Sequence, residues 1–410
     1  MDSNFKIGYI GYGNRGNGGA LLAQFLKMDD IDVVAVCDLV SEKQQAAAEK
    51  VKEKKGYMPV MTDNYKDLLE MDLDAVVNGA SWESHINIAI DCMNAGIPIA
   101  IEVGGAYSID EVWELVKTYE RTKVPCMMLT NVRYMKKEMA LVNMVRQGVF
   151  GKIVHCDGGY CHDLRKSMVL KKYYRLPNYM LRNADTYPCH ALGPILSILD
   201  INRGNKMVSL SSVASCSEGL HEFIKSECES NHPLSDYNFA QGDIVTTTIK
   251  CARGETITLR LDTTLPRPYS RRFEIHGTKG MFAEDGNYVY LHDEHKEMHE
   301  RPRELYNNAD EYVEKYNHPI WSEKDEAKGT MFASGHGGSD GMVCRAFIES
   351  VRDSLPMPTD IYDTAILMCI TVLSEQSVAM GGAPVAIPDF TKGAYITRKS
   401  LTPEDNPWSI

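Results

Sequence analysis

Two polar rings stand three residues apart in the segment TYPCHALGPI, residues 186–195. Tyr187 and His190 flank Pro188, and proline is favoured at the first position of a helix. Side chains three residues apart on a helix share a face, so both rings are expected near a helix N-terminus. Phenol and imidazole groups can donate and accept protons during catalysis. A helix start with a packed histidine has the same pattern, so the segment alone supports either a catalytic or a structural role.

A second tyrosine–histidine pair lies in the segment GKIVHCDGGYCHDLR, residues 151–165. Because side chains alternate along a strand, Tyr160 and His162 are expected on the same face. The cysteines beside histidines in this half of the chain follow no familiar zinc spacing, so we expect no metal site. The candidates to line one cleft are Tyr160, His162, Arg175, Tyr187, His190 and Tyr269.

A glycine-rich motif near the start of the chain indicates a dinucleotide. An apolar strand runs into GYGNRG, in which Gly11, Gly13 and Gly16 form G-x-G-x-x-G, and a helical pattern follows. Such glycines let the backbone approach a pyrophosphate at a helix N-terminus. A second strand ends in Asp38, an acid that can accept hydrogen bonds from a ribose 2′-hydroxyl and would repel a 2′-phosphate. The pattern therefore favours NAD over NADP, with a cofactor-free Rossmann-like fold as the alternative.

Strand and helix patterns then alternate as far as residue 131. This alternation predicts a parallel sheet with right-handed crossovers, and ligands of such sheets bind beyond the carboxyl ends of the strands. Three segments are expected at that edge, residues 81–85, residues 102–105 and residues 130–131. Each of them could instead be an ordinary loop cap.

The sequence after Asn131 is richer in β patterns with turn signals, such as a hairpin around Gly254. We therefore predict an α/β protein with two domains. Residues 1–131 would form an NAD-binding Rossmann domain with a doubly wound parallel sheet. Residues 132–410 would form an α+β substrate domain with an open, mostly antiparallel sheet, and an apolar helix near residues 361–380 would pack back at the domain junction.

Bulk composition excludes several classes of protein. The 410 residues exceed one ordinary core, and the net charge of −12 without a dense basic patch argues against nucleic acid. No apolar run is long enough to span a bilayer, and the start of the chain has no signal region, so a cytoplasmic protein is expected. Eleven cysteines without CxxC pairs fit reduced thiols. An open sheet face in the second domain suggests a possible homodimer.

The motifs, taken together, resemble a known family. The glycine loop followed by an open-sheet domain is similar to the Gfo/Idh/MocA oxidoreductases. SWESH, EVGGA, RNADTYPCHALGPILSILDINRGN and GHGG resemble its glycoside hydrolase family 109 branch, the NAD-dependent α-N-acetylgalactosaminidases. The resemblance implies NAD contacts at Asn14, Arg15, Asp38, Trp82, Glu83, Ser84, His85, Glu102, Val103, Asn131 and Tyr187, besides the motif glycines. It implies sugar contacts at Tyr160, Arg175, Tyr187, His190 and Tyr269, with Tyr160, His162, Tyr187 and His190 as catalytic groups.

The implied reaction cleaves a glycoside by oxidation at C3, elimination, addition of water and reduction, with tightly bound NAD recycled. It would place His190 and Tyr187 near C3, and Tyr160 and His162 near C2 and C1. Which of them is acid and which is base stays open, as do the sugar epimer, the anomer and the aglycone. An NAD-dependent sugar or cyclitol dehydrogenase and a non-catalytic sugar or NAD sensor are the alternatives.

Five positions depart from related patterns. Cys189 and Ala191 replace the branch's usual threonine and glycine beside the site histidine, and Gly104 replaces a proline. These changes leave the sugar specificity open. Val103 and Thr186 stand where plain dehydrogenases of the wider family carry lysine and aspartate. Their usual pair for moving a proton off a substrate hydroxyl is therefore missing, which argues against an ordinary sugar dehydrogenase.

Overall fold

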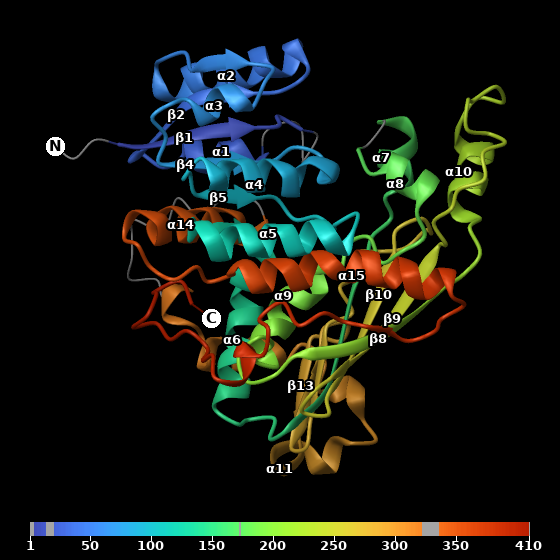
Figure 1. The fold of residues 1–410 in the computed structure, drawn as a ribbon. Coiled ribbons are helices and arrows are strands. Elements are labelled where there is room, and N and C mark those ends of the chain that lie inside the picture. Colours follow the sequence, from blue (N-terminus) through green and yellow to red (C-terminus); the bar gives the residue numbers. More distant parts are fainter. Residues whose placement is uncertain (1–3, 14–19, 172–173, 322–335, 410) are drawn as a thin grey trace. The chain divides into compact units, whose positions relative to one another are not determined.

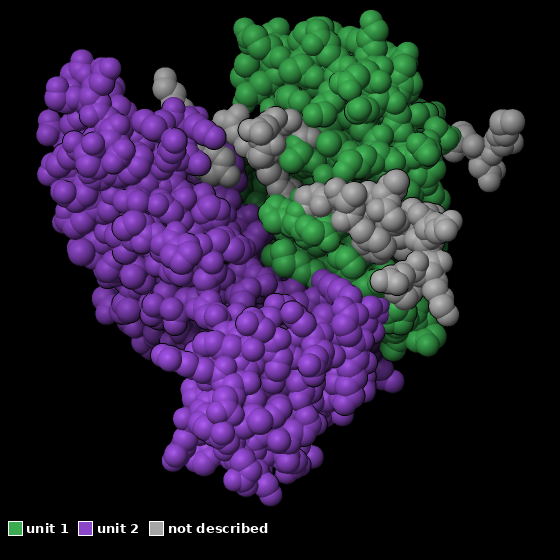
Figure 2. All heavy atoms as spheres, turned by 180° about the vertical axis from the view of Figure 1, so that it is seen from behind, with its two compact units in different colours: residues 1–135, 319–366, 401–410 green, residues 136–318, 367–400 purple. Residues whose placement is uncertain are grey.

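The computed structural model describes residues 4–13, 20–171, 174–321 and 336–409. The chain forms two compact units (Figure 2). Unit 1 comprises Met1–Met135, Pro319–Ile366 and Leu401–Ile410, and unit 2 comprises Lys136–His318 and Leu367–Ser400. The predicted division at residue 131 cuts the chain once, into an N-terminal and a C-terminal part. The compact units are defined by contacts between residues, and each contains separate segments of the chain. The chain therefore enters unit 2 after Met135 and returns to unit 1 twice.

Unit 1 contains a six-stranded parallel sheet, which confirms the predicted Rossmann fold (Figure 1). Its order, β3-β2-β1-β4-β5-β6, reverses direction between β1 and β4. The last three strands are buried along their whole length, as expected for a parallel sheet covered on both faces. The strands are β1 (Phe5–Ile10), β2 (Ile31–Cys37), β3 (Val60–Thr62), β4 (Ala75–Asn78), β5 (Ile99–Ile101) and β6 (Cys126–Met128).

Local sequence features explain where two helices of unit 1 begin or end. Gly56 ends α2 in the left-handed conformation, with φ of 83°, which glycine adopts without a side-chain clash. Ser108 and Glu111 form a reciprocal capping box at the start of α5. The α-helices are α1 (Ala20–Leu26), α2 (Ser41–Lys55), α3 (Lys66–Leu69), α4 (His85–Asn94), α5 (Ile109–Thr122) and α14 (Ser339–Arg352). The 3₁₀ turns are η1 (Trp82–Ser84), η2 (Asn131–Tyr134), η5 (Pro319–Trp321) and η7 (His336–Gly338).

Unit 2 contains an eight-stranded mixed sheet in the order β13-β12-β11-β7-β10-β9-β8-β14, which confirms the predicted mostly antiparallel sheet. Only the central pair of β7 and β10 is parallel among the pairs described. The strands are β7 (Ile153–Cys161), β8 (Met207–Ala214), β9 (Ile244–Cys251), β10 (Thr256–Asp262), β11 (Glu274–Gly277), β12 (Gly280–Ala283), β13 (Tyr288–Leu291) and β14 (Val385–Ala386).

The two faces of this sheet differ in character. On one face Gly158 of β7 lies so close to a helix that an added Cβ would be 2.7 Å from the Cβ of Ala191, so glycine permits the packing. On the other face β9 and β10 present Thr246, Thr248 and Thr258, which are partly or fully exposed. That face is polar there, so hydrophobic burial alone does not argue for the expected homodimer, which stays a prediction.

Seven α-helices lie wholly within the described residues of unit 2. They are α6 (Lys136–Arg146), α7 (Arg165–Leu170), α8 (Leu176–Leu181), α9 (Cys189–Ile198), α10 (Gly219–Glu227), α11 (His292–His295) and α12 (Ala309–Lys315). The 3₁₀ turns are η3 (Lys296–Met298), η4 (Pro302–Glu304) and η8 (Ala394–Ile396).

The long apolar helix α15 (Ile361–Ala379) has residues in both units, because unit 1 extends to Ile366. Its bounds agree with the helix expected near residues 361–380, and its place at the domain junction stays a prediction. Among the described residues, no helix has both the length and the apolar character needed to cross a membrane.

Candidate functional site

Gly11, the first residue of the glycine motif, directly follows β1 and lies beside Ala80, which comes shortly after β4. Gly11 has φ of 82°, and a Cβ added there would lie 2.4 Å from backbone atoms of Ala80. No other residue could hold this backbone without displacing the neighbouring loop. The contact joins β1 and β4 where the strand order reverses, which is where doubly wound sheets bind ligands. Three of the predicted NAD contacts, Asn14, Arg15 and Gly16, lie outside the described residues.

Asp38 directly follows β2 and is oriented by backbone donors. One carboxylate oxygen accepts a hydrogen bond from the Tyr12 N–H at 2.8 Å, and the other accepts one from the Val40 N–H at 3.0 Å. The structure therefore holds Asp38 against Tyr12 in the glycine motif, where an acid for a ribose hydroxyl is expected. Its contact with NAD stays a prediction.

The segment from Trp82 to His85 is tightly packed at the same edge of the sheet. His85 is fully buried, and burial lowers its pKa to about 4, so the ring is neutral and its Nε2 donates to the Ala80 carbonyl at 3.0 Å. A Cβ added at Gly104 would lie 2.6 Å from the Trp82 ring and 3.1 Å from His85 Nδ1. Gly104 therefore permits the close packing of the Glu102–Val103 turn against these two rings.

Asn131 is held by a side chain that sequence reasoning missed. Its Nδ2 donates to Asp340 at 2.6 Å, and the second Asp340 oxygen lies 2.9 Å from His336 Nδ1. The motif GHGG, which contains His336 and nearly adjoins Asp340, was the available signal.

Two buried amide groups at this edge carry atoms without a hydrogen-bond partner in the described structure, Asn131 Oδ1 and Asn78 Nδ2. Buried polar atoms are nearly always satisfied, so these two fit the polar groups of a bound ligand. Together with the glycine loop and Asp38, they make the residues present suitable for a dinucleotide.

In unit 2 the predicted rings meet around Tyr160, at the end of β7. Its ring centroid lies 4.4 Å from that of Tyr187 and 5.3 Å from that of His190, and the latter two are 4.7 Å apart. α9 begins at Cys189, so Pro188 is its N-cap and not its first helical residue. The expected position of Pro188 was wrong by one residue, while the proximity of the two rings was predicted correctly.

His162 and Tyr269 extend the group on the side of the next loop. The His162 ring lies 6.0 Å from Tyr160 and 5.3 Å from Tyr269, and Tyr269 lies 6.4 Å from Tyr160. Tyr269 is half exposed, whereas Tyr187 and His190 are buried. The group therefore reaches from the protein interior to solvent, as a substrate site requires.

Arg175, just before α8, supplies a buried positive charge. Its guanidinium carbon lies 4.1 Å from the Tyr187 ring centroid and 5.3 Å from that of Tyr160. Its Nε donates to the Tyr174 hydroxyl at 3.2 Å. With Arg175, the structure brings together all six side chains predicted to line one cleft, and we call them the ring cluster: Tyr160, His162, Arg175, Tyr187, His190 and Tyr269. Their roles toward a substrate stay predictions.

Burial and neighbouring charge shift the pKa values of Tyr187 and His162 in opposite directions. Burial raises the pKa of Tyr187 well above its usual value, against the opposing effect of Arg175, so this phenol stays protonated. Burial lowers the pKa of His162, and the positive charge of Arg175 lowers it further. A neutral imidazole can accept a proton near neutral pH, while the Tyr187 phenol can only donate one.

Three acidic side chains near the ring cluster are paired with an arginine or have a raised pKa. The Asp163 carboxylate binds Arg165 at 2.7 Å, and Asp262 binds Arg267 at 2.6 Å. Asp185, which sequence reasoning missed, is buried, and burial raises its pKa to about 7. Its position two residues before Tyr187 was the available signal. None of the six members of the ring cluster is a carboxylate.

The positions that depart from the family pattern have distinct contacts. Cys189 is buried, and its sulfur lies 3.8 Å from His190 Nδ1. Ala191 faces Gly158 of β7 instead. Of the two changes, Cys189 is thus the one that touches a ring of the cluster.

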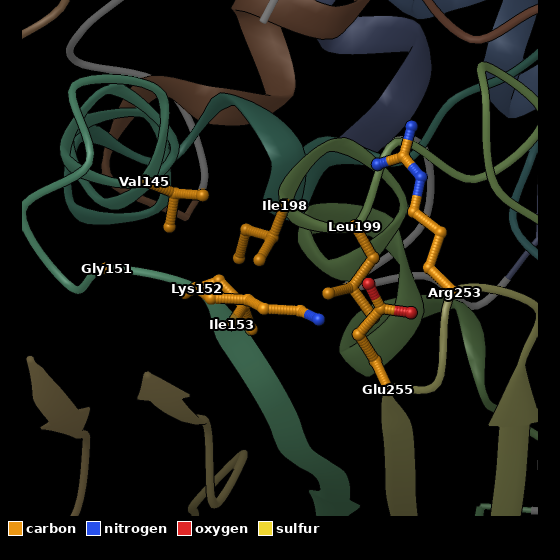
Figure 3. A pocket seen from close by; sticks show the side chains of 8 residues that line it. All are labelled: Val145, Gly151, Lys152, Ile153, Ile198, Leu199, Arg253 and Glu255. Carbon is orange, nitrogen blue, oxygen red and sulfur yellow. The ribbon is translucent and has the colours of Figure 1, made fainter. Parts of the chain in front are cut away.

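A separate cavity of about 490 Å³ lies at the other end of β7, where Ile153 begins the strand (Figure 3). No member of the ring cluster lines it, so we do not assign the sugar to this cavity. Its lining residues are Val145, Gly151, Lys152, Ile153, Ile198, Leu199, Arg253 and Glu255.

Fold and site together define an NAD-binding protein with a cluster of tyrosine, histidine and arginine side chains in a second, sheet-containing unit. Comparison with known proteins gives the family. Residues 5–130 match the oxidoreductase family with an NAD-binding Rossmann fold, and residues 134–397 match the C-terminal domain of glycosyl hydrolase 109. The chain belongs to glycoside hydrolase family 109, a family of NAD-dependent glycosidases.

Relatives at the sequence level cover nearly the whole chain. An α-N-acetylgalactosaminidase of Tannerella forsythia is 37% identical over 426 residues, which cover 97% of this chain and 88% of that protein. A glycosyl hydrolase family 109 protein of Parabacteroides distasonis is 35% identical over 426 residues, covering 97% of this chain and 89% of that protein.

Solved structures show the same fold at low identity. A myo-inositol 2-dehydrogenase from Lactobacillus plantarum has a TM-score of 0.66 at 16% identity, covering 94% of this chain and all of that chain. A levoglucosan dehydrogenase has a TM-score of 0.68 at 17% identity, with 94% of this chain and all of that chain covered. At such identities the likeness concerns the fold alone.

Proposed function

We propose that this protein hydrolyses α-N-acetylgalactosaminides or a related hexoside by oxidation, elimination, addition of water and reduction. The observation that carries the proposal is the ring cluster, which offers proton donors and acceptors but no carboxylate pair. Most glycosidases use two carboxylates, and NAD-dependent ones are an exception. The substrate class is supported by the relative that is 37% identical and is named an α-N-acetylgalactosaminidase.

When bound, NAD supplies a hydride acceptor for C3 of the sugar and returns the hydride at the end of the cycle. In our proposal Tyr187 and His190 hold the C3 hydroxyl. His190 accepts the hydroxyl proton during oxidation and returns it during reduction, while Tyr187 stays protonated because burial raises its pKa. A ketone at C3 makes the hydrogen at C2 acidic, because its loss gives an enolate. Loss of that proton then expels the group at C1, which leaves as an alcohol after taking up a proton. Water adds to the resulting double bond, with its hydroxyl on C1 and a proton on C2.

His162 is the base that we assign to the C2 proton, because its lowered pKa keeps the imidazole neutral. Tyr160, whose ring contacts both histidines and Tyr187, acts at C1 in this scheme. Arg175 is buried against Tyr160 and Tyr187, so we assign it to a sugar hydroxyl or the acetamido oxygen. Unit 2 is accordingly the substrate-binding part of the chain in this proposal.

Hydrolysis in heavy water tests the proposed function. An aryl α-N-acetylgalactosaminide should be cleaved with deuterium incorporated at C2 of the released sugar, and NADH should not accumulate. Assays with aryl glycosides of gluco and galacto configuration, in both anomers, determine the sugar specificity that the change at Cys189 leaves open. Cleavage without deuterium at C2 would refute elimination. NADH accumulation with an intact glycosidic bond would indicate a dehydrogenase, and no reaction at all would indicate a sensor.

A further inference from the structure

Strands β7 and β11 bring four metal-ligating side chains to one face of the unit 2 sheet. Their antiparallel register pairs Glu274 with Asp157 and His276 with His155. The residue between the two members of each strand is buried, so the four side chains share the face opposite to it. The pair on β7 and the pair on β11 are more than a hundred residues apart in the sequence, so the four residues together form no local motif.

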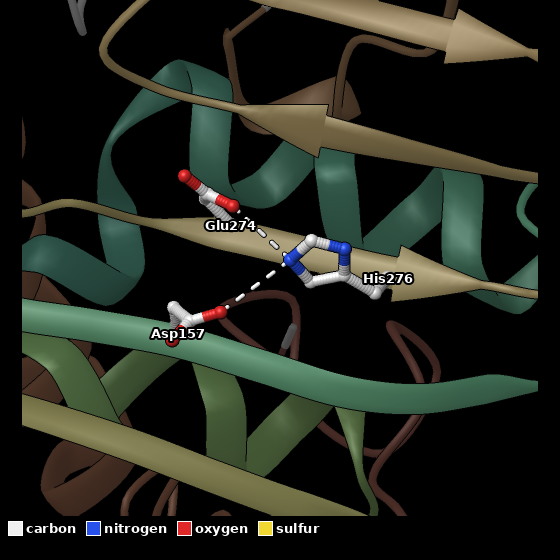
Figure 4. A group of neighbouring side chains, drawn as sticks. All are labelled: Asp157, Glu274 and His276. Atoms are coloured by element: carbon white, nitrogen blue, oxygen red, sulfur yellow. Dashed lines mark hydrogen bonds and ion pairs between the residues drawn. The ribbon is translucent and has the colours of Figure 1, made fainter.

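The ligand atoms of this group converge (Figure 4). His276 Nε2 lies 3.1 Å from Glu274 Oε2 and 3.4 Å from Asp157 Oδ2. One ligand atom from each of these three residues lies within 4.8 Å of the others. Two ligands of a tetrahedral zinc ion, each about 2.1 Å from the metal, are about 3.4 Å apart. An ion could therefore enter with small movements of the side chains.

His155 holds Asp157 from the neighbouring side. Its Nε2 lies 3.0 Å from Asp157 Oδ2, and its Nδ1 lies 2.7 Å from Thr256 Oγ1 on β10. Side chains that bind a metal ligand without touching the metal, as His155 would do here, orient that ligand. The side chains of the four residues are between 27% and 33% exposed, so an ion can reach them from solvent.

We propose that Asp157, Glu274 and His276 bind one divalent transition-metal ion, with Zn²⁺ as the best fit. Imidazole nitrogen with carboxylate oxygen suits zinc, whereas magnesium and calcium prefer oxygen ligands alone. A water molecule completes the tetrahedron, and His155 positions Asp157. The ion joins β7 to β11 on the face opposite to the ring cluster. Its role is to stabilise the sheet that carries Tyr160, and it is independent of the proposed sugar chemistry.

Metal titration of the full chain tests this proposal. The protein is treated with EDTA, dialysed, and titrated with zinc chloride in a calorimeter. We expect one Zn²⁺ per chain with a micromolar or lower Kd, and a melting temperature that rises with zinc but not with magnesium. Cobalt should give the visible absorption of a tetrahedral site without a thiolate charge-transfer band. Absence of saturable zinc binding to the wild-type chain overturns the proposal, as does a thiolate band.

Variants locate the ion. Asp157→Asn and His276→Gln should each weaken zinc binding at least tenfold. A matched control is His299→Gln, because His299 also lies near an acid, 3.7 Å from Glu300, but outside the group. It should bind zinc as the wild type does. Equal affinity in all three variants would place the ion elsewhere and refute the proposed ligands. Melting curves of the metal-free variants show whether each one is folded.

Discussion

The glycine-loop edge of unit 1 and the ring cluster of unit 2 are built by different means. In unit 1 the polar groups are set by the backbone, since Asp38 accepts two backbone N–H groups and Gly11 lies against the backbone of Ala80. In unit 2 side chains meet side chains, as Tyr160 does with Tyr187 and with other rings. The first site should therefore depend on backbone conformation, and the second on the chemistry of each ring.

The largest effect is expected from Gly11→Ala. The added methyl group meets the backbone of Ala80 at 2.4 Å, and φ of 82° disfavours alanine. Strain and overpacking together should cost about 2–6 kcal/mol of stability, and bound NAD should be lost. The measurements are the melting temperature and the NAD released from denatured protein.

Gly56→Ala is the matched control for this experiment. Gly56 has nearly the same φ, 83°, but an added Cβ meets nothing within 4 Å. It should cost about 1–2 kcal/mol and leave the NAD content unchanged. Equal stability and equal NAD content in the two variants would show that the close approach of Gly11 to Ala80 is unimportant. The site in unit 1 would then not depend on this backbone contact.

Substitutions in the ring cluster should affect turnover instead of folding. Tyr187→Phe removes the buried proton donor and His190→Ala removes the adjacent imidazole, so each should lower kcat about 100-fold. NAD content should stay near that of the wild type. As a control, Tyr237→Phe removes a tyrosine hydroxyl of the same unit that lies 3.4 Å from the Met180 carbonyl, outside the cluster. Near-normal turnover in both site variants would favour a structural role for the two rings.

The smallest effect concerns Asp185 and the pH dependence of stability. Its pKa is about 7 in the folded chain and about 3.9 when unfolded. Below pH 4 both states are protonated, so nothing is lost there. Between pH 4 and 7 only the unfolded state loses the proton, so stability falls as pH rises through this window. Asp185→Asn removes this dependence.

The wild type should therefore lose a few degrees of melting temperature relative to Asp185→Asn between pH 4 and pH 8. Asp293→Asn, at an exposed position of α11, should follow the wild type at both pH values. A constant difference between the wild type and Asp185→Asn would mean that Asp185 is ionised in the folded protein. Asp185 would then be an ionised carboxylate two residues from Tyr187. A carboxylate could then take part in catalysis beside the ring cluster.

The sequence by itself determined the fold class, the cofactor and the family. Strand and helix periodicity, the glycine motif and an acid after the second strand are local patterns, and local patterns follow from backbone geometry. They were sufficient to predict the Rossmann sheet and the open, mostly antiparallel sheet. They also named the six members of the ring cluster, because motifs of the family mark them.

The tertiary structure alone decided which distant groups meet. Asp340 binds Asn131 across more than two hundred residues, and burial raises the pKa of Asp185 to about 7. The pairing of β7 with β11 brings His276 to within 3.4 Å of Asp157. The two returns of the chain to unit 1 also had no local signal. Such contacts depend on how separate elements pack, and packing is a property of the whole core that no single segment encodes.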